Sequence, residues 1–418
     1  MPTSRKAMLT LARTVSCFVP LPFVLLEQEE RSLMKMLWKL VACLVALGVL
    51  AACGTQATPA PAQAPAATTA PEPTKAEAKP APEMAKVTLQ LQWVPQSQFA
   101  GYYAALSKGF YTEEGLDVAI KPGAVEIVPQ QVVATGGAEF GIAWVPKVLA
   151  SREQGADLVN IAQLFQRSGT LEISWTDSGI TKPEDWRGKK VGTWGFGNEP
   201  ELFAAMRKVG IDPNNASDVT IVQQPFDMSL LLNREVDAAQ AMTYNEYAQV
   251  LEAVNPKTGE LYKPEDLNVV SFEDVGTAML QDAVFVRGDW IAQPENQDIA
   301  VRFLRASFKG WMFCRDTPDE CVQIVLDAGT ALGKGHMTWM LNEINALIWP
   351  SPNGIGVMDP DAWKRTAEIA QQFEIIKNAP DDKAYRTDLA EQALQGLDGD
   401  TRGLDWKKAQ VEVTKGGE

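Results

Sequence analysis

The sequence predicts an α/β protein built from two similar lobes, each with a mainly parallel sheet. Two observations carry this prediction. From residue 87 onward, short alternating or apolar segments typical of strands are separated by segments typical of helices. The same succession begins again after residue 186. The part expected to fold spans about 330 residues, which is enough for two lobes of ordinary domain size.

In the first cycle, alternating or apolar runs predict strands at residues 87–91, 116–120, 138–143 and 158–164. Longer apolar segments between them predict helices at residues 99–110, 128–134 and 146–154. Pro129 and Pro146 fall near the starts of the last two helices, where proline is well accommodated. We therefore expect strand–helix units and a parallel sheet.

The second cycle has the same character. Strands are expected at residues 190–194, 219–222 and 236–241, and helices at residues 201–209 and 228–233. Beyond Asp289 the pattern is helical, with helices expected at residues 294–314, 319–332, 338–348 and 361–378. We assign residues 86–175 and 285–400 to the first lobe and residues 176–284 to the second. Residues 401–418 are expected to form a C-terminal tail.

The segment before the first predicted strand indicates export and lipid anchoring. Leu50-Ala51-Ala52-Cys53 resembles a bacterial lipobox, and it follows Lys35, Lys39 and an apolar run at 40–49. Positive charge, a short apolar run and small residues, in that order, are typical of a secretory signal. The alternative is a buried helix that ends in a cysteine. We expect residues 1–52 to be a signal peptide, with translation beginning at Met34 or Met36, and Cys53 to carry the lipid.

Residues 53–85 are rich in proline and alanine and contain no large apolar residue before Met84. Such a segment cannot bury enough apolar surface to fold. We expect it to be a tether between the membrane, reached through the lipid anchor, and the folded lobes.

Composition and charge exclude several classes of function. The net charge is −15 and there is no long basic run, which argues against a nucleic-acid partner. His336 is the single histidine and has no acidic or cysteine neighbours at ligand spacing, so we expect no metal site. Cys314 and Cys321 fit either a disulfide, favoured by an oxidising compartment, or two free buried thiols.

Several blocks resemble a known family. LQWVP at residues 91–95 and GYYAALSKGFYTEEGLDV at residues 101–118 resemble the opening of the thiamine-pyrimidine-synthase-like binding proteins, and residues 179–192 and 237–239 are similar as well. The resemblance implies a two-lobed, type II periplasmic-binding-protein-like fold with a hinge between the lobes. It also implies an extracytoplasmic lipoprotein that delivers a small molecule to an ABC permease subunit. Within the family, the chain resembles the riboflavin-binding members.

The residues that follow the predicted strands are rich in aromatic and amide side chains. Planar heteroaromatic ligands stack on flat aromatic faces, and amides such as those of Gln98 and Asn245 can read the edges of a ring. Aromatic residues at strand ends also often close the core, and Glu199 could instead favour the start of a helix. The candidate ligand-binding residues are Trp93, Gln96, Phe99, Tyr102, Trp144, Trp194, Asn198, Glu199 and Tyr244.

Four alternatives to riboflavin import remain open. The ligand could be a thiamine pyrimidine precursor, although the number of aromatic candidates favours the larger flavin. The loop Gly195-x-Gly197 could cradle an anion, but it contains no lysine or arginine, which favours a neutral ligand. A pyrimidine-synthase-like enzyme is less consistent, because no cysteine or histidine falls in the predicted cleft. We therefore expect no catalytic residues and no cofactor beyond the transported ligand. A sensor subunit that delivers its ligand to a signalling partner also fits the sequence.

Overall fold

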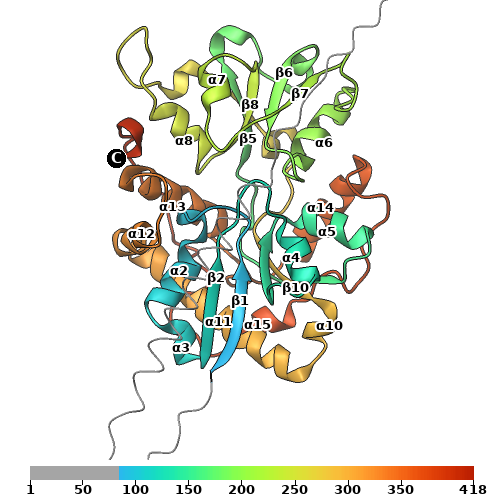
Figure 1. Ribbon diagram of the computed structural model, residues 1–418, viewed down its shortest axis with the longest axis vertical. Coiled ribbons are helices and arrows are strands. Elements are labelled where there is room, and N and C mark those ends of the chain that lie inside the picture. Colours follow the sequence, from blue (N-terminus) through green and yellow to red (C-terminus); the bar gives the residue numbers. More distant parts are fainter. Residues whose placement is uncertain (1–83) are drawn as a thin grey trace, which may run out of the picture. The chain divides into compact units, whose positions relative to one another are not determined.

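The computed structural model describes residues 84–418. The predicted signal peptide, Cys53 and nearly all of the predicted tether lie outside the described residues. The described part contains two five-stranded sheets, each flanked by helices (Figure 1). The predicted two-lobed α/β fold is confirmed.

The sheet of the first lobe is built around β1 (Ala85–Gln90), which pairs in parallel with β2 (Leu116–Lys121) and β3 (Phe140–Ala143). A late strand, β10 (Ala283–Arg287), inserts antiparallel between β3 and β4 (Leu158–Gln163). The order is therefore β2-β1-β3-β10-β4. All residues of β3 and of the edge strand β4 are buried, as expected for strands with both faces covered.

The second lobe repeats this topology. Strand β6 (Lys190–Thr193) pairs in parallel with β7 (Thr220–Gln223) and β8 (Ala238–Met242). Strand β5 (Thr170–Trp175) runs antiparallel between β8 and β9 (Leu267–Ser271), which gives the order β7-β6-β8-β5-β9. In each lobe, the strand that enters from the other lobe is the antiparallel one.

The chain crosses between the lobes twice, in the segments 164–169 and 276–282. Strand β5 hydrogen-bonds to β8 and β9, so it belongs to the second lobe. Our sequence-based limit at residue 175 therefore lies too late, because it leaves this strand in the first lobe. The strand is fully buried in the second sheet, which gives it no place in the first.

The first lobe carries most of the helices. Its helices are α2 (Ala100–Ser107), α3 (Phe110–Glu113), α4 (Pro129–Ala134), α5 (Val145–Glu153), α10 (Gly288–Ile291), α11 (Pro294–Asp316), α12 (Pro318–Asp327), α13 (Lys334–Ile348), α14 (Pro360–Gln372) and α15 (Asp388–Leu394). The expected helix at 99–110 is divided, because Gly109 adopts a left-handed φ of 76° between α2 and α3.

Helix α11 packs closely on α2. A Cβ atom at Gly310 would lie 2.0 Å from the carbonyl oxygen of Gly101, so only glycine permits this approach. At its C-terminal end, α11 is joined to α12 by a disulfide between Cys314 and Cys321. Of the two interpretations that the sequence left open, the structure has the disulfide.

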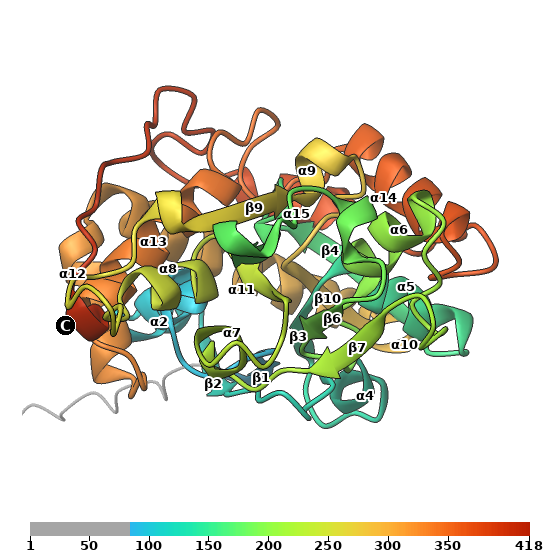
Figure 2. The same cartoon turned by 90° about the horizontal axis from the view of Figure 1, so that it is seen from above.

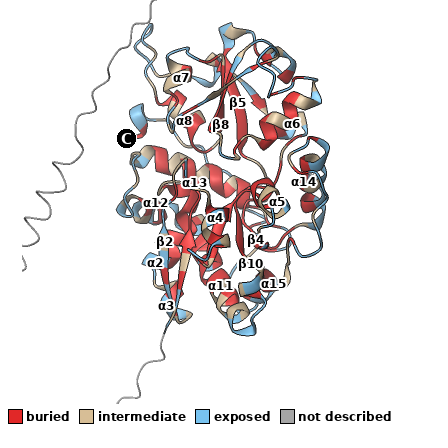
Figure 3. Ribbon diagram, turned by 45° about the vertical axis from the view of Figure 1, so that its right-hand side comes forward, coloured by how far each residue is buried: buried red, intermediate tan, exposed pale blue. Residues whose placement is uncertain are grey.

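The second lobe has shorter helices, namely α6 (Pro200–Lys208), α7 (Ser229–Leu232), α8 (Glu246–Leu251) and α9 (Phe272–Val275). Figure 2 shows α6 together with α5 and α14 of the first lobe on one side of the sheets. The strands and the inner faces of the helices form the buried core (Figure 3).

The predicted C-terminal tail packs against the folded lobes. Asn342 of α13 exchanges two hydrogen bonds with the backbone of Ala409, at 2.8 and 2.9 Å. Further on, the backbone N–H of Gly416 donates to the carbonyl oxygen of Glu252, which follows α8. Residues 401–418 therefore run along α13 and reach the second lobe.

Candidate ligand-binding site

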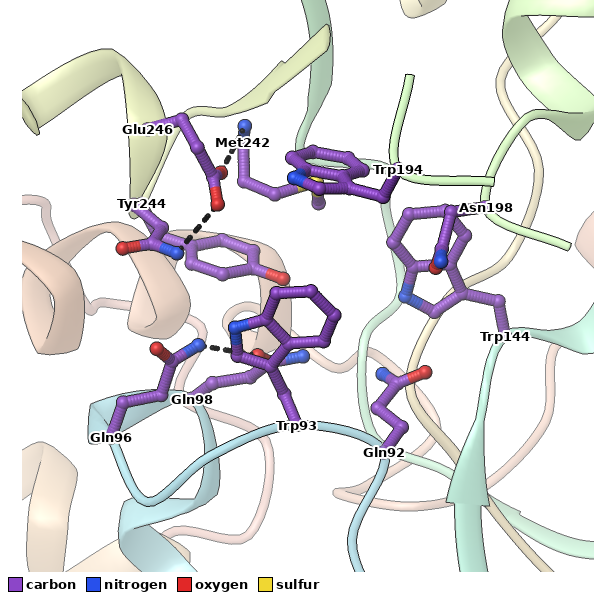
Figure 4. Close-up of a pocket in the computed structure, with 11 residues that line it drawn as sticks. Gln92, Trp93, Gln96, Gln98, Trp144, Trp194, Asn198, Met242, Tyr244 and Glu246 are labelled. Carbon is purple, nitrogen blue, oxygen red and sulfur yellow. Dashed lines mark hydrogen bonds between the residues drawn. The ribbon is translucent and has the colours of Figure 1, made fainter. Parts of the chain in front are cut away.

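A pocket with about 350 Å³ of empty space lies between the lobes, beyond the carboxyl ends of β1, β3, β6 and β8 (Figure 4). Ligands of open α/β sheets bind at this edge, because loops there can present side chains without disturbing the sheet. Both lobes contribute walls. The lining residues are Gln92, Trp93, Gln96, Gln98, Trp144, Trp194, Asn198, Met242, Tyr244, Asn245 and Glu246.

The wall from the first lobe comes from the turn after β1 and from the end of β3. Gln92 and Trp93 follow β1, and Trp144 directly follows β3. Gln92 and Trp144 are buried, whereas Trp93 keeps part of its surface exposed. Trp93 therefore lies at the mouth of the pocket and the other two lie deeper (Figure 4).

The wall from the second lobe begins with Trp194, which directly follows β6. Asn198 is held in place from two sides, because its Nδ2 donates to the carbonyl oxygen of Gly195 at 2.7 Å and its own carbonyl oxygen accepts from Gln240 Nε2 at 2.8 Å. Its Oδ1 accepts from the ammonium group of Lys147 at 3.1 Å, across the gap between the lobes. Burial lowers the pKa of Lys147 to about 8.

The remaining wall follows β8 and contains a buried carboxylate. The carboxylate of Glu246 accepts from the backbone N–H of Met242 at 3.0 Å and from Asn245 Nδ2 at 2.7 Å (Figure 4). Burial raises the pKa of Glu246 to about 7, and these hydrogen bonds oppose only part of that shift. Of the lining residues in the described part, none is a lysine or an arginine.

Aromatic contacts bridge the mouth of the pocket. The ring of Trp93 lies 6.4 Å from that of Trp194, edge to face, with an angle of 69° between the planes. Trp93 also stacks on Phe226, at 6.2 Å and 25°. Both partners belong to the second lobe, so one indole of the first lobe contacts two aromatic rings of the second.

Most of the predicted site residues meet at this pocket. Trp93, Gln96, Trp144, Trp194, Asn198 and Tyr244 line it, as do Gln98 and Asn245. Phe99 and Tyr102 do not. Both are buried in the core of the first lobe, where Tyr102 packs edge to face against Trp311 of α11 at 5.7 Å. Here the alternative interpretation, that aromatic residues at strand ends close the core, is the correct one.

Glu199 also lies outside the pocket. It occupies the N-cap position of α6, and its side chain accepts no capping hydrogen bond. It lines a separate groove together with Lys147 instead. The expectation that Glu199 faces the ligand is therefore not supported by its position.

Four residues at or beside the pocket were absent from the sequence-based set, namely Gln92, Met242, Glu246 and Phe226. Gln92 precedes Trp93 in the same turn, and Glu246 closely follows a predicted strand, so position at a strand end could have indicated both. Phe226 lies in a loop after β7, and no local pattern marks its contact with Trp93.

His336 has partners that its sequence neighbourhood does not reveal. Its Nδ1 lies 2.8 Å from a carboxylate oxygen of Glu252, and its Nε2 lies 2.9 Å from Oδ1 of Asn245. Glu252 is 84 residues away in the sequence, so the spacing around His336 could not indicate this partner. The imidazole links α13 to the residues behind the pocket.

Within residues 84–418, no three histidine, cysteine, aspartate or glutamate side chains gather as metal ligands would. Within the same range, no helix has both the length and the apolar character needed to cross a membrane.

Two lobes, two crossovers and a pocket between them define the periplasmic-binding-protein fold, and solved structures agree. A protein of Bordetella bronchiseptica RB50 matches with a TM-score of 0.58 at 16% identity, over 75% of this chain and 98% of that chain. The periplasmic aliphatic sulphonate binding protein SsuA of Escherichia coli matches with a TM-score of 0.51 at 15% identity, over 79% and 94%. Residues 96–321 match the family described as NMT1/THI5 like, and the chain belongs to that family.

Curated relatives include binding proteins and enzymes. Riboflavin-binding protein RibY of Chloroflexus aurantiacus is 26% identical over 322 residues, which is 74% of this chain and 87% of the relative. A formylaminopyrimidine-binding protein of Halalkalibacterium halodurans is 23% identical over 284 residues, or 66% and 82%. A 4-amino-5-hydroxymethyl-2-methylpyrimidine phosphate synthase of Legionella pneumophila is 24% identical over 245 residues, or 58% and 74%.

Proposed function

We propose that this protein is the solute-binding component of an ABC importer and that it captures riboflavin between its lobes. The observation that carries the proposal is the composition of the pocket, in which aromatic and amide side chains from both lobes surround the space and none of the lining residues in 84–418 is a cation. The fold and the similarity to RibY support the same function.

The absence of a lining cation within the described residues favours a neutral ligand. A buried sulfonate or phosphate needs cationic or strong hydrogen-bonding partners to replace its hydration. Lys147 does not line the pocket, and its ammonium group donates to Asn198, which does. Glu246 adds negative charge to the wall when it ionises. A flavin without a phosphate fits this charge pattern better than an anion does.

The walls also suit a flat ring system. Trp93, Trp144 and Trp194 present three indoles around the space, and stacked aromatic pairs contribute about 0.5–1.5 kcal/mol beyond burial. Amide groups of both lobes lie between these rings and can bind the polar edge of a heterocycle. The isoalloxazine ring of riboflavin has both features, namely a large flat face and an edge of carbonyl and N–H groups.

A thiamine pyrimidine precursor is the second candidate. Two observations favour it, namely the similarity to a formylaminopyrimidine-binding protein and the size of the pocket. The space enclosed by the lining residues is small for a three-ring flavin and suits a single ring better. A single pyrimidine ring would need less aromatic wall than this pocket offers.

We propose that the protein binds its ligand without converting it. Several relatives are named as pyrimidine phosphate synthases, so catalysis is the natural rival. Of the lining residues in the described part, none is a cysteine or a histidine that could act as a nucleophile. Multiple turnover of riboflavin or of a pyrimidine by the purified protein would contradict the proposal.

The proposed location is the outer face of the cell membrane, with a lipid on Cys53 and a permease subunit as partner. The lipobox-like sequence and the proline-rich segment after it support this placement. Metabolic labelling with a palmitate analogue is expected to mark the wild-type protein and not the Cys53→Ser variant, which should be released from membranes. Equal labelling of both would contradict the anchor.

A fluorescence titration tests the ligand. Riboflavin fluorescence is followed as purified protein, freed of bound ligand, is added. Saturable quenching at a one-to-one ratio, not reversed by excess thiamine pyrimidine, is expected for a flavin receptor. No quenching, together with calorimetric binding of the pyrimidine, would assign the pocket to the second candidate.

A further inference from the structure

Asp282 lies where the two crossovers meet. It is the last residue before β10 and is buried, with 3% of its surface exposed. Its carbonyl oxygen accepts from the backbone N–H groups of Leu164 and Phe165, in the other crossover, at 3.2 and 3.4 Å. The backbone of Asp282 therefore ties one crossover to the other, close behind the pocket.

The carboxylate of Asp282 holds three residues that line the pocket. It accepts hydrogen bonds from Gln92 Nε2 at 2.6 Å, from Gln98 Nε2 at 2.9 Å and from Trp144 Nε1 at 3.1 Å. Burial raises the pKa of Asp282 to about 6, and the three hydrogen bonds limit that rise. The group is therefore mainly ionised at neutral pH, and an ionised carboxylate can only accept hydrogen bonds.

This restriction determines which way the neighbouring amides face. Gln92 and Gln98 must turn their nitrogen atoms toward Asp282, so their oxygen atoms face away from it. Gln98 Oε1 then accepts from Gln96 Nε2 at 2.8 Å. The side-chain oxygen of Gln96 is left without a hydrogen-bond partner among the described residues. The carboxylate of Asp282 thus orients the amides of Gln92 and Gln98 directly. It orients the amide of Gln96 through Gln98.

Two oxygen atoms at the end of these chains have no partner among the described residues. They are Gln92 Oε1 and Gln96 Oε1, both buried and both on residues that line the pocket. The indole N–H groups of Trp93 and Trp194 are unpaired in the same way. Buried polar groups without partners cost free energy, so a ligand that pairs with all four groups gains affinity.

We propose that Asp282 is a positioning residue that makes the glutamine side of the pocket accept hydrogen bonds, so that the pocket selects a planar ring with N–H donors on one edge and acceptors facing the indoles. This inference rests on the proposed function of solute capture and deepens it. The imide edge of a flavin supplies one such N–H donor, and the amino group of an aminopyrimidine supplies two. Asp282 acts only through the glutamines and contacts no ligand itself.

The test compares two ligands on two variants. The ligands are riboflavin and its N3-methyl derivative, which has lost the imide N–H. The wild type is expected to prefer riboflavin by at least about fivefold, because a methyl group leaves a buried oxygen unpaired. In Asp282→Asn the new amide offers one donor and one acceptor, so a glutamine turns and the preference falls below about twofold.

A matched control separates this effect from the loss of a buried carboxylate in general. Glu172 lies in β5, is fully buried and has no hydrogen-bond partner among the described residues. Glu172→Gln makes the same kind of change away from the pocket and should keep the wild-type preference. A full preference in Asp282→Asn, or no preference in the wild type, would overturn the proposal.

Two further measurements keep the test decisive. If Asp282→Asn does not fold, Gln92→Met and Gln96→Met remove the accepting oxygens directly, and at least one must lose the preference. If the wild type binds neither flavin, the riboflavin assignment fails. NMR of the ligand-free protein then tests the hydrogen bonds around Asp282 without any ligand. The side-chain signals of Gln92, Gln98 and Trp144 should then move in Asp282→Asn and stay in place in Glu172→Gln. Unmoved signals would overturn the network.

Discussion

The indole of Trp93 stacks on the ring of Phe226 across the gap between the lobes, with 6.2 Å between the ring centres and 25° between their planes. The two residues are 133 positions apart and follow strands of different sheets. A ligand stabilises a closed state when it and the lobes make stronger contacts there than in an open state. This stack joins the two lobes at the pocket, which Trp93 lines and Phe226 does not.

Phe226→Ala is expected to speed the release of ligand. Loss of an aromatic pair worth about 0.5–1.5 kcal/mol should weaken binding roughly twofold to tenfold, mostly through the dissociation rate. Stopped-flow fluorescence with riboflavin measures this rate. Phe196 is a suitable control, because it lies in a nearby loop, is 51% exposed and does not line the pocket, so Phe196→Ala should leave the rate unchanged. Equal rates for both variants would contradict the role of the stack.

Trp93→Ala and Tyr102→Ala should have opposite consequences. Trp93 lines the pocket at its mouth, so its loss should weaken binding by about tenfold, roughly 1.4 kcal/mol, with little change in the unfolding of the ligand-free protein. Tyr102 is buried against Trp311, so its loss should lower the free energy of unfolding by about 3 kcal/mol. Calorimetry and chemical denaturation distinguish the two. A destabilised Trp93→Ala would assign this indole to the core.

Glu201 is expected to make the protein less stable as the pH rises. Burial raises its pKa from 4.5 to about 7, so between these values the folded state binds more protons than the unfolded chain. The free energy of unfolding therefore falls across this window, by up to about 3 kcal/mol, and the loss is complete above pH 7.

Denaturation at several pH values checks this prediction. Glu201→Gln should remove the fall in the free energy of unfolding that this carboxyl group causes as the pH rises. Ser168→Ala is the matched control, since it deletes a hydrogen bond to the same carboxylate at 3.0 Å and keeps the titrating group. Its slope should persist. An unchanged slope in Glu201→Gln would show that the carboxyl group does not titrate in this window.

The disulfide between Cys314 and Cys321 should stabilise the protein without affecting the pocket. It joins α11 to α12 in the first lobe, and neither cysteine lines the pocket. A short closed loop restricts the unfolded chain modestly, so replacing both cysteines by serine should cost about 2–3 kcal/mol of unfolding free energy. Riboflavin affinity at 25 °C should stay within about twofold of the wild type. A large loss of affinity would mean that the two helices position the binding residues.

Local patterns predicted the strands that pair with neighbours close to them in the sequence and within one lobe. The expected segments at 116–120, 190–194 and 236–241 overlap β2, β6 and β8 closely. Strands β5, β9 and β10 were not expected, although β10 is an apolar run. Each is next to a crossover, and two of the three insert antiparallel between strands that come from elsewhere in the chain. The crossing of the chain between the lobes determines which strands they pair with, and their own hydrophobic periodicity does not.

The sequence by itself determined the α/β class, the family and the side chains that follow the ends of the strands, because periodicity and short motifs are local properties. It could place Trp93 at the carboxyl edge of the first sheet, and Trp194 and Tyr244 at the carboxyl edge of the second, since parallel strands bring their carboxyl ends together. Only the tertiary structure decided which aromatic residues face the pocket and which complete the core. It alone joined Asp282 to Gln92 across 190 positions. Packing and buried hydrogen bonds depend on contacts between distant segments, and no local pattern in the chain encodes them.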